Sequence, residues 1–111
     1  MLRVNMMIDW SRVEELRRDF GEDDFAEIVV LFLSEVQERL AIMATQPSSE
    51  PSEDYHFLKG SAANLGFEQL YQACSSAERD GDDGGVRKLC DIFEASKTEF
   101  LSGTGITLSA A

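Results

Sequence analysis

The chain has 111 residues, of which 43% are hydrophobic and 28% are charged. This length fits one domain with a single core and leaves no room for a separate nucleotide-binding module, which argues against a complete kinase. Twenty-one acidic and ten basic residues give a formal net charge of −11. Such a charge disfavours nucleic acid and anionic lipid as partners, and we expect a protein partner with a basic rim.

The expected location is the cytoplasm. No stretch approaches the roughly 20 apolar residues that a membrane span needs, and residues 1–8 lack the long apolar run of a secretory signal. Cys74 and Cys90 are expected to be reduced and buried there. A disulfide between them stays conceivable if their helices are antiparallel neighbours. With a single histidine, the two thiols are too few for a structural zinc site.

Apolar residues recur at three- and four-residue spacings, which predicts an all-α fold. We expect an antiparallel up-down four-helix bundle with an additional short N-terminal helix. That short helix is predicted over 9–20, where Ser11 and Glu14 have capping-box spacing and Gly21 can end it in a left-handed conformation. The longest helix is predicted over 23–45. The apolar stripes of these two helices are Trp10, Val13, Leu16 and Phe20, and then Phe25, Ile28, Val29, Phe32, Val36, Leu40 and Met43.

A polar connection over 46–52 leads to a third helix over 51–65, with Pro51 in its first turn and Gly66 at its end. A fourth helix is expected over 67–79 and, after a Gly-Asp turn, a fifth over 86–101. Residues 102–111 are expected to form a frayed tail. The last two stripes are Phe67, Leu70, Tyr71, Cys74 and Ala77, and then Val86, Leu89, Cys90, Phe93 and Phe100.

The third helix carries His56, the only histidine of the chain. At about 100° per residue, Lys59, Gly60 and Ala63 fall within roughly 60° of His56, whereas Leu58 points to the opposite side. Ser61 and Ala62 are expected to lean toward the core. The pattern therefore predicts one buried face and one exposed face. The exposed face carries the His56 imidazole, the Lys59 ammonium and Gly60, which has no side chain.

These residue types suit a phosphoryl carrier. Imidazole, with an unperturbed pKa of roughly 6.5, is nucleophilic and mostly neutral near pH 7. Lys59, the only lysine or arginine between Arg39 and Arg79, can stabilise the negative charge of a phosphoryl group in transfer. Gly60 costs about 0.5 to 1 kcal/mol relative to alanine in a helix. Close approach by a partner would compensate for that cost.

The segment resembles the histidine phosphotransfer (HPt) family, whose motif reads His-x-Leu-Lys-Gly-Ser-x-x-x-Leu-Gly. The fixed positions are all present, as His56, Leu58, Lys59, Gly60, Ser61, Leu65 and Gly66. Glu78, before the Gly-Asp turn, is similar to the end of the family's fourth helix. The resemblance implies that His56 is phosphorylated, that Lys59 assists electrostatically and that Gly60 gives clearance to a receiver domain. Tyr55 departs from the small residue expected before the histidine, and it joins Ala63 and Asn64 as an expected partner-binding residue.

The resemblance implies a phosphocarrier without kinase activity of its own. His56 would accept a phosphoryl group from a receiver-domain aspartyl phosphate and pass it to the receiver of another response regulator. A hybrid histidine kinase is a further candidate partner. No cofactor is expected in this chain, because Mg²⁺ would belong to the receiver, and a monomer is the expected state. The kinase, the regulator and the net direction of flow stay open.

Three alternatives remain. An adaptor could bind receivers without carrying phosphate. A phosphoacceptor fragment of a sensor or chemotaxis-type kinase should continue into dimerisation and ATP-binding segments, which this sequence does not contain. Metal binding through His56, Cys74 and Cys90 would require two core-facing thiols to meet an outward imidazole.

Overall fold

The computed structural model describes residues 6–46, 50–80 and 85–108. All regular structure in these residues is helical, which confirms the predicted all-α class. The helices are α1 (Trp10–Thr45), α2 (Pro51–Leu65), α3 (Glu68–Asp80) and α4 (Gly85–Thr104). None of them is both long enough and apolar enough to cross a membrane.

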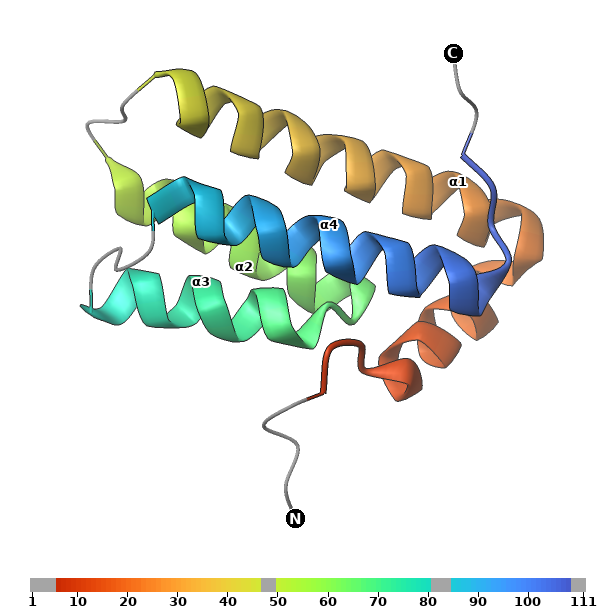
Figure 1. Cartoon of the computed structure of the whole chain (residues 1–111). Coiled ribbons are helices and arrows are strands. Elements are labelled where there is room, and N and C mark those ends of the chain that lie inside the picture. Colours follow the sequence, from red (N-terminus) through yellow and green to blue (C-terminus); the bar gives the residue numbers. More distant parts are fainter. Residues whose placement is uncertain (1–5, 47–49, 81–84, 109–111) are drawn as a thin grey trace.

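The four helices surround one core. Each packs against two others, in the order α1, α2, α3, α4 and back to α1. Figure 1 shows the chain reversing its direction between successive helices. Residues from every helix, and Phe67 between α2 and α3, fill the interior. The largest fully buried side chains are Phe25, Phe67, Phe93, Phe100, Leu58, Leu65 and Leu70.

Gly21 divides α1 at a kink. The residues on both sides of Gly21 are helical, whereas Gly21 itself lies outside the helical region, with φ 79° and ψ 162°. Glycine adopts this φ readily because it has no Cβ. The chain changes direction there, as Figure 1 shows in orange. Phe20, expected in the apolar stripe, is 43% exposed, because the break removes it from the continuing core face.

The core face of the long part of α1 is also slightly rotated from its expected position. Leu33 is buried, although the predicted stripe omitted it, whereas Ile28, Phe32 and Met43 pack only partly buried against the core. Apolar residues also occupy both edges of this stripe. The 3.6-residue period alone therefore does not show which of them are fully buried.

The N-terminus of α1 is capped by Asp9 and not by Ser11. The Asp9 carboxylate accepts hydrogen bonds from the backbone N–H groups of Ser11 at 3.2 Å and Arg12 at 3.4 Å. Ser11 lies within the helix, so the expected Ser11–Glu14 capping box is wrong. An Asp at the N-cap performs the same task by accepting bonds from otherwise unpaired N–H groups.

The turn between α2 and α3 holds the start of α1. Gly66 ends α2 in a left-handed conformation with φ 80° and ψ 21°, as expected. Its carbonyl accepts a 2.7 Å hydrogen bond from the backbone N–H of Asp9. A Cβ on Gly66 would lie 2.8 Å from the Asp9 carbonyl oxygen, so only glycine allows the two segments this close. Phe67 precedes α3, which begins one residue later than expected.

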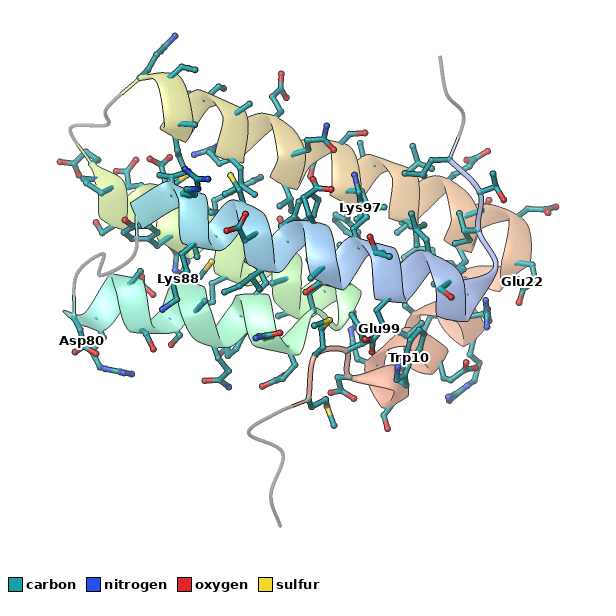
Figure 2. All side chains as sticks on the ribbon, viewed as in Figure 1. Trp10, Glu22, Asp80, Lys88, Lys97 and Glu99 are labelled. Carbon is teal, nitrogen blue, oxygen red and sulfur yellow. The ribbon has the colours of Figure 1, made fainter. Side chains whose placement is uncertain are left out.

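The expected frayed tail is wrong for the part of it that the structure describes. Helix α4 continues to Thr104, whose carbonyl accepts a 3.3 Å hydrogen bond from the Arg17 guanidinium. Ile106 and Leu108 then pack against the core. Trp10 stacks on Phe100 at 6.2 Å between ring centroids, at the C-terminal end of α4 (Figure 2). These contacts order the segment, and residues 109–111 lie outside the described part.

Both cysteines are free thiols. Cys74 is fully buried on α3, as expected, but Cys90 on α4 is only partly buried, which corrects the expectation for that residue. Burial raises the pKa of the Cys74 thiol to about 12 and also raises the pKa of Cys90. Both thiols are therefore poor nucleophiles at neutral pH.

Candidate functional site

The motif helix α2 is fixed firmly at both ends. Pro51 occupies its first turn together with the acidic residues Glu53 and Asp54, which interact favourably with the positive end of the helix dipole. Asp54 forms a 2.8 Å ion pair with Arg39 of α1. The same guanidinium lies over the Phe57 ring at 4.3 Å from its centroid. At the other end the Gly66 carbonyl accepts the hydrogen bond from Asp9, so α1 and its cap hold both ends of the helix that carries His56.

The two faces of α2 differ as the spacing predicted. His56 has 75% of its side chain exposed, whereas Leu58 and Ala62 are 0% exposed. Ser61 is also buried, at 6%, which agrees with its expected lean toward the core. The imidazole is therefore presented to solvent from a helix whose other side is anchored in the interior.

Glu78 of α3 contacts both polar residues of the motif. One carboxylate oxygen accepts a hydrogen bond from the Lys59 ammonium at 2.5 Å, and the other lies 3.5 Å from His56 Nδ1. The Lys59 and Glu78 side chains are 24% and 28% exposed, so the pair lies at the edge of the bundle. The carboxylate therefore links the nucleophile candidate to its expected cationic helper.

This contact changes the ionisation of both partners. The hydrogen bond from Lys59 lowers the pKa of the Glu78 carboxyl below its usual value, and the neighbouring Lys59 charge acts in the same direction. The hydrogen bond to Glu78 raises the pKa of Lys59. Partial burial of each group opposes these shifts. Near neutral pH the site therefore contains a full carboxylate and a full ammonium beside the imidazole.

Sequence reasoning placed Glu78 at the end of a helix but did not assign it to the site. Glu78 lies 19 positions after Lys59 in the chain, and only the packing of α2 on α3 brings the two together. One signal was present: Glu78 follows the buried stripe residues Cys74 and Ala77, which puts it beside the α2 interface.

Gly60 is not required by the packing of this chain. A Cβ built on Gly60 would have no atom within 4 Å outside its own helix backbone. The residue is in the middle of α2, where alanine would be more stable by about 0.5 to 1 kcal/mol. The open space next to His56 is therefore available to another molecule.

The expected partner-binding residues divide into two groups. Ala63 and Asn64 are exposed on α2, and the Asn64 carbonyl accepts a 3.2 Å hydrogen bond from Arg12 Nε. Tyr55 is only 6% exposed and belongs to the core, so its expected place on the partner-facing surface is wrong. It precedes His56 by one position, and a rotation of 100° moves its ring to the buried side of the helix.

The described residues contain no group of three or more histidine, cysteine, aspartate or glutamate side chains placed to hold a metal ion. The remote alternative of a metal site shared by His56, Cys74 and Cys90 therefore has no geometric support among these residues. The chemistry that the site supports is that of an exposed imidazole flanked by an ion pair.

Comparison with known proteins identifies the family. The family model described as Hpt domain matches residues 27–101, which include α2, α3 and most of α4. No curated protein and no solved structure matches the chain. The match covers more than half of the sequence, and it contains the motif helix and the Glu78 contact. Hpt domains act in phosphotransfer within phosphorelays, where they interact with receiver domains and histidine kinases, and this chain belongs to the Hpt domain family.

Proposed function

We propose that this protein is a phosphoryl carrier that uses His56 to accept a phosphoryl group from a receiver-domain aspartyl phosphate and passes it to a second receiver. One observation carries the proposal: His56 is exposed on a helix with Lys59 and the open space at Gly60 on the same face. A partner can approach the imidazole from solvent without moving any side chain of the core.

The position of Glu78 favours one ring nitrogen as the nucleophile. A carboxylate near Nδ1 stabilises the tautomer with its proton on Nδ1, which leaves the lone pair on Nε2. The 3.5 Å separation is at the outer limit of a hydrogen bond, and such contacts often shorten in the reacting complex. Nε2 would attack phosphorus, the N–P bond would form, and the receiver aspartate would leave with the electron pair of the broken P–O bond.

Lys59 would stabilise the charge that the phosphoryl oxygens carry during this transfer. Its ammonium is one helical turn from His56 and is only partly exposed, where an electrostatic interaction is stronger than in bulk water. Gly60, with Ala63 and Asn64 farther along the exposed face, would form the surface on which the receiver docks.

Several finer features belong to the same proposal. The helices form an antiparallel up-down bundle, and the residues before Gly21 serve as its additional N-terminal helix; the alternating directions in Figure 1 support this arrangement. The protein acts as a cytoplasmic monomer without kinase activity of its own. The Mg²⁺ of the reaction is held by the receiver and not by this chain.

The proposal is tested by transfer from a phosphorylated receiver to the purified chain, compared with its His56→Gln variant. The wild type should gain an acid-labile phosphoryl group, and His56→Gln should gain none while keeping its helical circular dichroism. Glu68→Gln, which changes a carboxylate near the start of α3, serves as the matched control and should be labelled normally. Equal labelling of the wild type and His56→Gln would refute the assignment.

The same assay separates the two alternatives. A kinase-derived phosphoacceptor that retained its own activity would be labelled by ATP alone, whereas a carrier requires the phosphorylated receiver. An adaptor would bind receivers but gain no label from any of them. The presence of His56 and Lys59 on one exposed face favours the carrier over the adaptor.

A further inference from the structure

We infer that Glu78 lowers the stability of phosphorylated His56 by competing with the phosphoryl group for Lys59, and thereby keeps the carrier ready to release its phosphoryl group. This inference rests on the proposed function and concerns the equilibrium of transfer. The observation behind it is that one carboxylate contacts both His56 and Lys59.

In the unphosphorylated protein the ammonium of Lys59 already has an anionic partner. It donates a 2.5 Å hydrogen bond to Glu78, and this bond is charge-assisted on both sides. A phosphoryl group on His56 would bring further anionic oxygens to the same face of α2. Lys59 would then either leave Glu78 or divide its hydrogen bonds between two anions, and part of the original contact would be lost.

Glu78 also acts directly on the phosphorylated ring. When Nε2 carries the phosphoryl group and the Nδ1 proton has left to solvent, the Nδ1 lone pair faces the Glu78 oxygen that lies 3.5 Å from Nδ1 in the free protein. The Nδ1 lone pair and the Glu78 oxygen are both hydrogen-bond acceptors and repel each other. The negative carboxylate is also close to the negative phosphoryl group. Both effects raise the free energy of the phosphorylated state relative to the free one.

The measurable quantity is the equilibrium constant of transfer. Aspartyl phosphate of the receiver and free His56 give free aspartate and phosphohistidine: one P–O bond breaks and one N–P bond forms. Glu78→Gln keeps the size and an amide oxygen that can accept from Nδ1–H, but it removes the negative charge. We expect this variant to shift the equilibrium toward the phosphorylated carrier by about three- to tenfold. This is the range for losing a partly exposed ion pair together with the repulsion between the Glu78 carboxylate and the phosphoryl group.

The experiment equilibrates each full-length protein with one phosphorylated receiver at pH 8.5 and measures both phosphorylated species. Glu53→Gln is the matched control, because Glu53 is an exposed carboxylate on α2, one turn before His56, and this variant loses the same single negative charge as Glu78→Gln. Its shift should be less than half of that of Glu78→Gln. Glu78→Ala, which cannot contact Lys59, should shift the equilibrium in the same direction as Glu78→Gln.

Each outcome is decisive. An unchanged or lower equilibrium constant in both Glu78 variants would refute the inference that Glu78 competes for Lys59. A shift in Glu53→Gln as large as that in Glu78→Gln would also refute it, because the shift would then be an effect of net charge alone. These results leave the proposed function intact as long as wild-type His56 is phosphorylated. No phosphorylation of the wild type would refute the proposed function and, with it, this inference. A merely structural role for Glu78 predicts lower labelling after substitution, the opposite of the expected gain.

Discussion

At the scale of single residues, the proposed transfer requires Lys59 to lie close enough to the phosphoryl group to stabilise it. Lys59 is on the same face of α2 as His56 and is held by Glu78 at 2.5 Å. It is therefore positioned before any partner arrives. Its ammonium is already on the reacting face, so transfer requires only that part of its contact with Glu78 is exchanged for contact with the phosphoryl oxygens.

Removing this cation should slow transfer without unfolding the protein. We expect Lys59→Met to reduce the rate of phosphoryl transfer from a receiver on the order of tenfold, because one partly exposed charge is lost from the reacting face. Single-turnover transfer kinetics measure this rate. Lys97→Met is the control, since Lys97 is on α4, which does not pack against α2. A rate for Lys59→Met equal to that of Lys97→Met would contradict the role of Lys59.

Gly60 allows folding and function to be separated at one position. Gly60→Ala should raise the free energy of unfolding by about 0.5 to 1 kcal/mol, because the added Cβ meets open space. Gly60→Trp should leave the fold intact and block the approach of a receiver, so that transfer falls by at least about tenfold. Urea denaturation and transfer kinetics report the two effects. Normal transfer by Gly60→Trp would show that the receiver does not approach over Gly60.

The ionisation of Glu78 predicts how stability depends on pH. Its folded-state pKa is lowered from the usual 4.5 by the hydrogen bond from Lys59. A lowered pKa contributes stability above the unfolded-state value, and this contribution is lost as the pH falls through the folded-state value. The stability difference between wild type and Glu78→Gln should therefore be present at neutral pH and shrink below pH 4.5. Urea denaturation across this range checks the sign, and a difference that grows on acidification would contradict it.

At the scale of elements, the turn between α2 and α3 determines where the motif helix ends. Gly66 has φ 80°, and a Cβ there would lie 2.8 Å from the Asp9 carbonyl oxygen. This turn connects three segments: the end of α2, Phe67 in the core and the cap of α1. Residues far from His56 therefore fix the helix that presents it.

Two glycines with the same φ can separate backbone strain from crowding. Gly105 has φ 78° with nothing within 4 Å of a built Cβ, whereas Gly66 is crowded by Asp9. We expect Gly105→Ala to cost about 1 kcal/mol of stability and Gly66→Ala clearly more, about 2 to 4 kcal/mol. Thermal denaturation compares the two variants. Equal losses would mean that the contact with Asp9 contributes nothing.

Most helix positions could be predicted from the sequence because each helix has a strong apolar stripe and clear end signals. The bounds of α2 agree with the prediction at both Pro51 and Leu65. A break with a positive φ at Gly21 could be predicted from the sequence, but the direction in which the chain continues after it depends on tertiary packing. The order of residues 102–108 was missed because it comes from contacts with Trp10 and Arg17, which are far away in the chain.

At the scale of the whole molecule, the candidate site combines one helix that the sequence predicts with one contact that it does not. The face with His56, Lys59 and Gly60 follows from spacing within α2. The burial of Tyr55 follows from the rotation of the same helix, and the expectation of an exposed ring rested only on comparison with the family motif. Glu78 required the packing of α2 against α3, which no local pattern specifies.

The bundle therefore serves to hold a small exposed site in a fixed geometry. Four helices in a ring bury one core, and His56 lies outside it, with 75% of its side chain exposed. Partners would be selected by the surface around His56, while the interior keeps the relative positions of α2 and α3 constant.

The most direct test of the carrier function is a two-step relay with the full-length protein. The chain is phosphorylated by one receiver, separated from it, examined by peptide mapping and then mixed with a second, unphosphorylated receiver. We predict that the phosphoryl group maps to His56 and then moves to the aspartate of the second receiver. A phosphoryl group on any other residue, or one on His56 that no receiver can remove, would contradict the proposed carrier function.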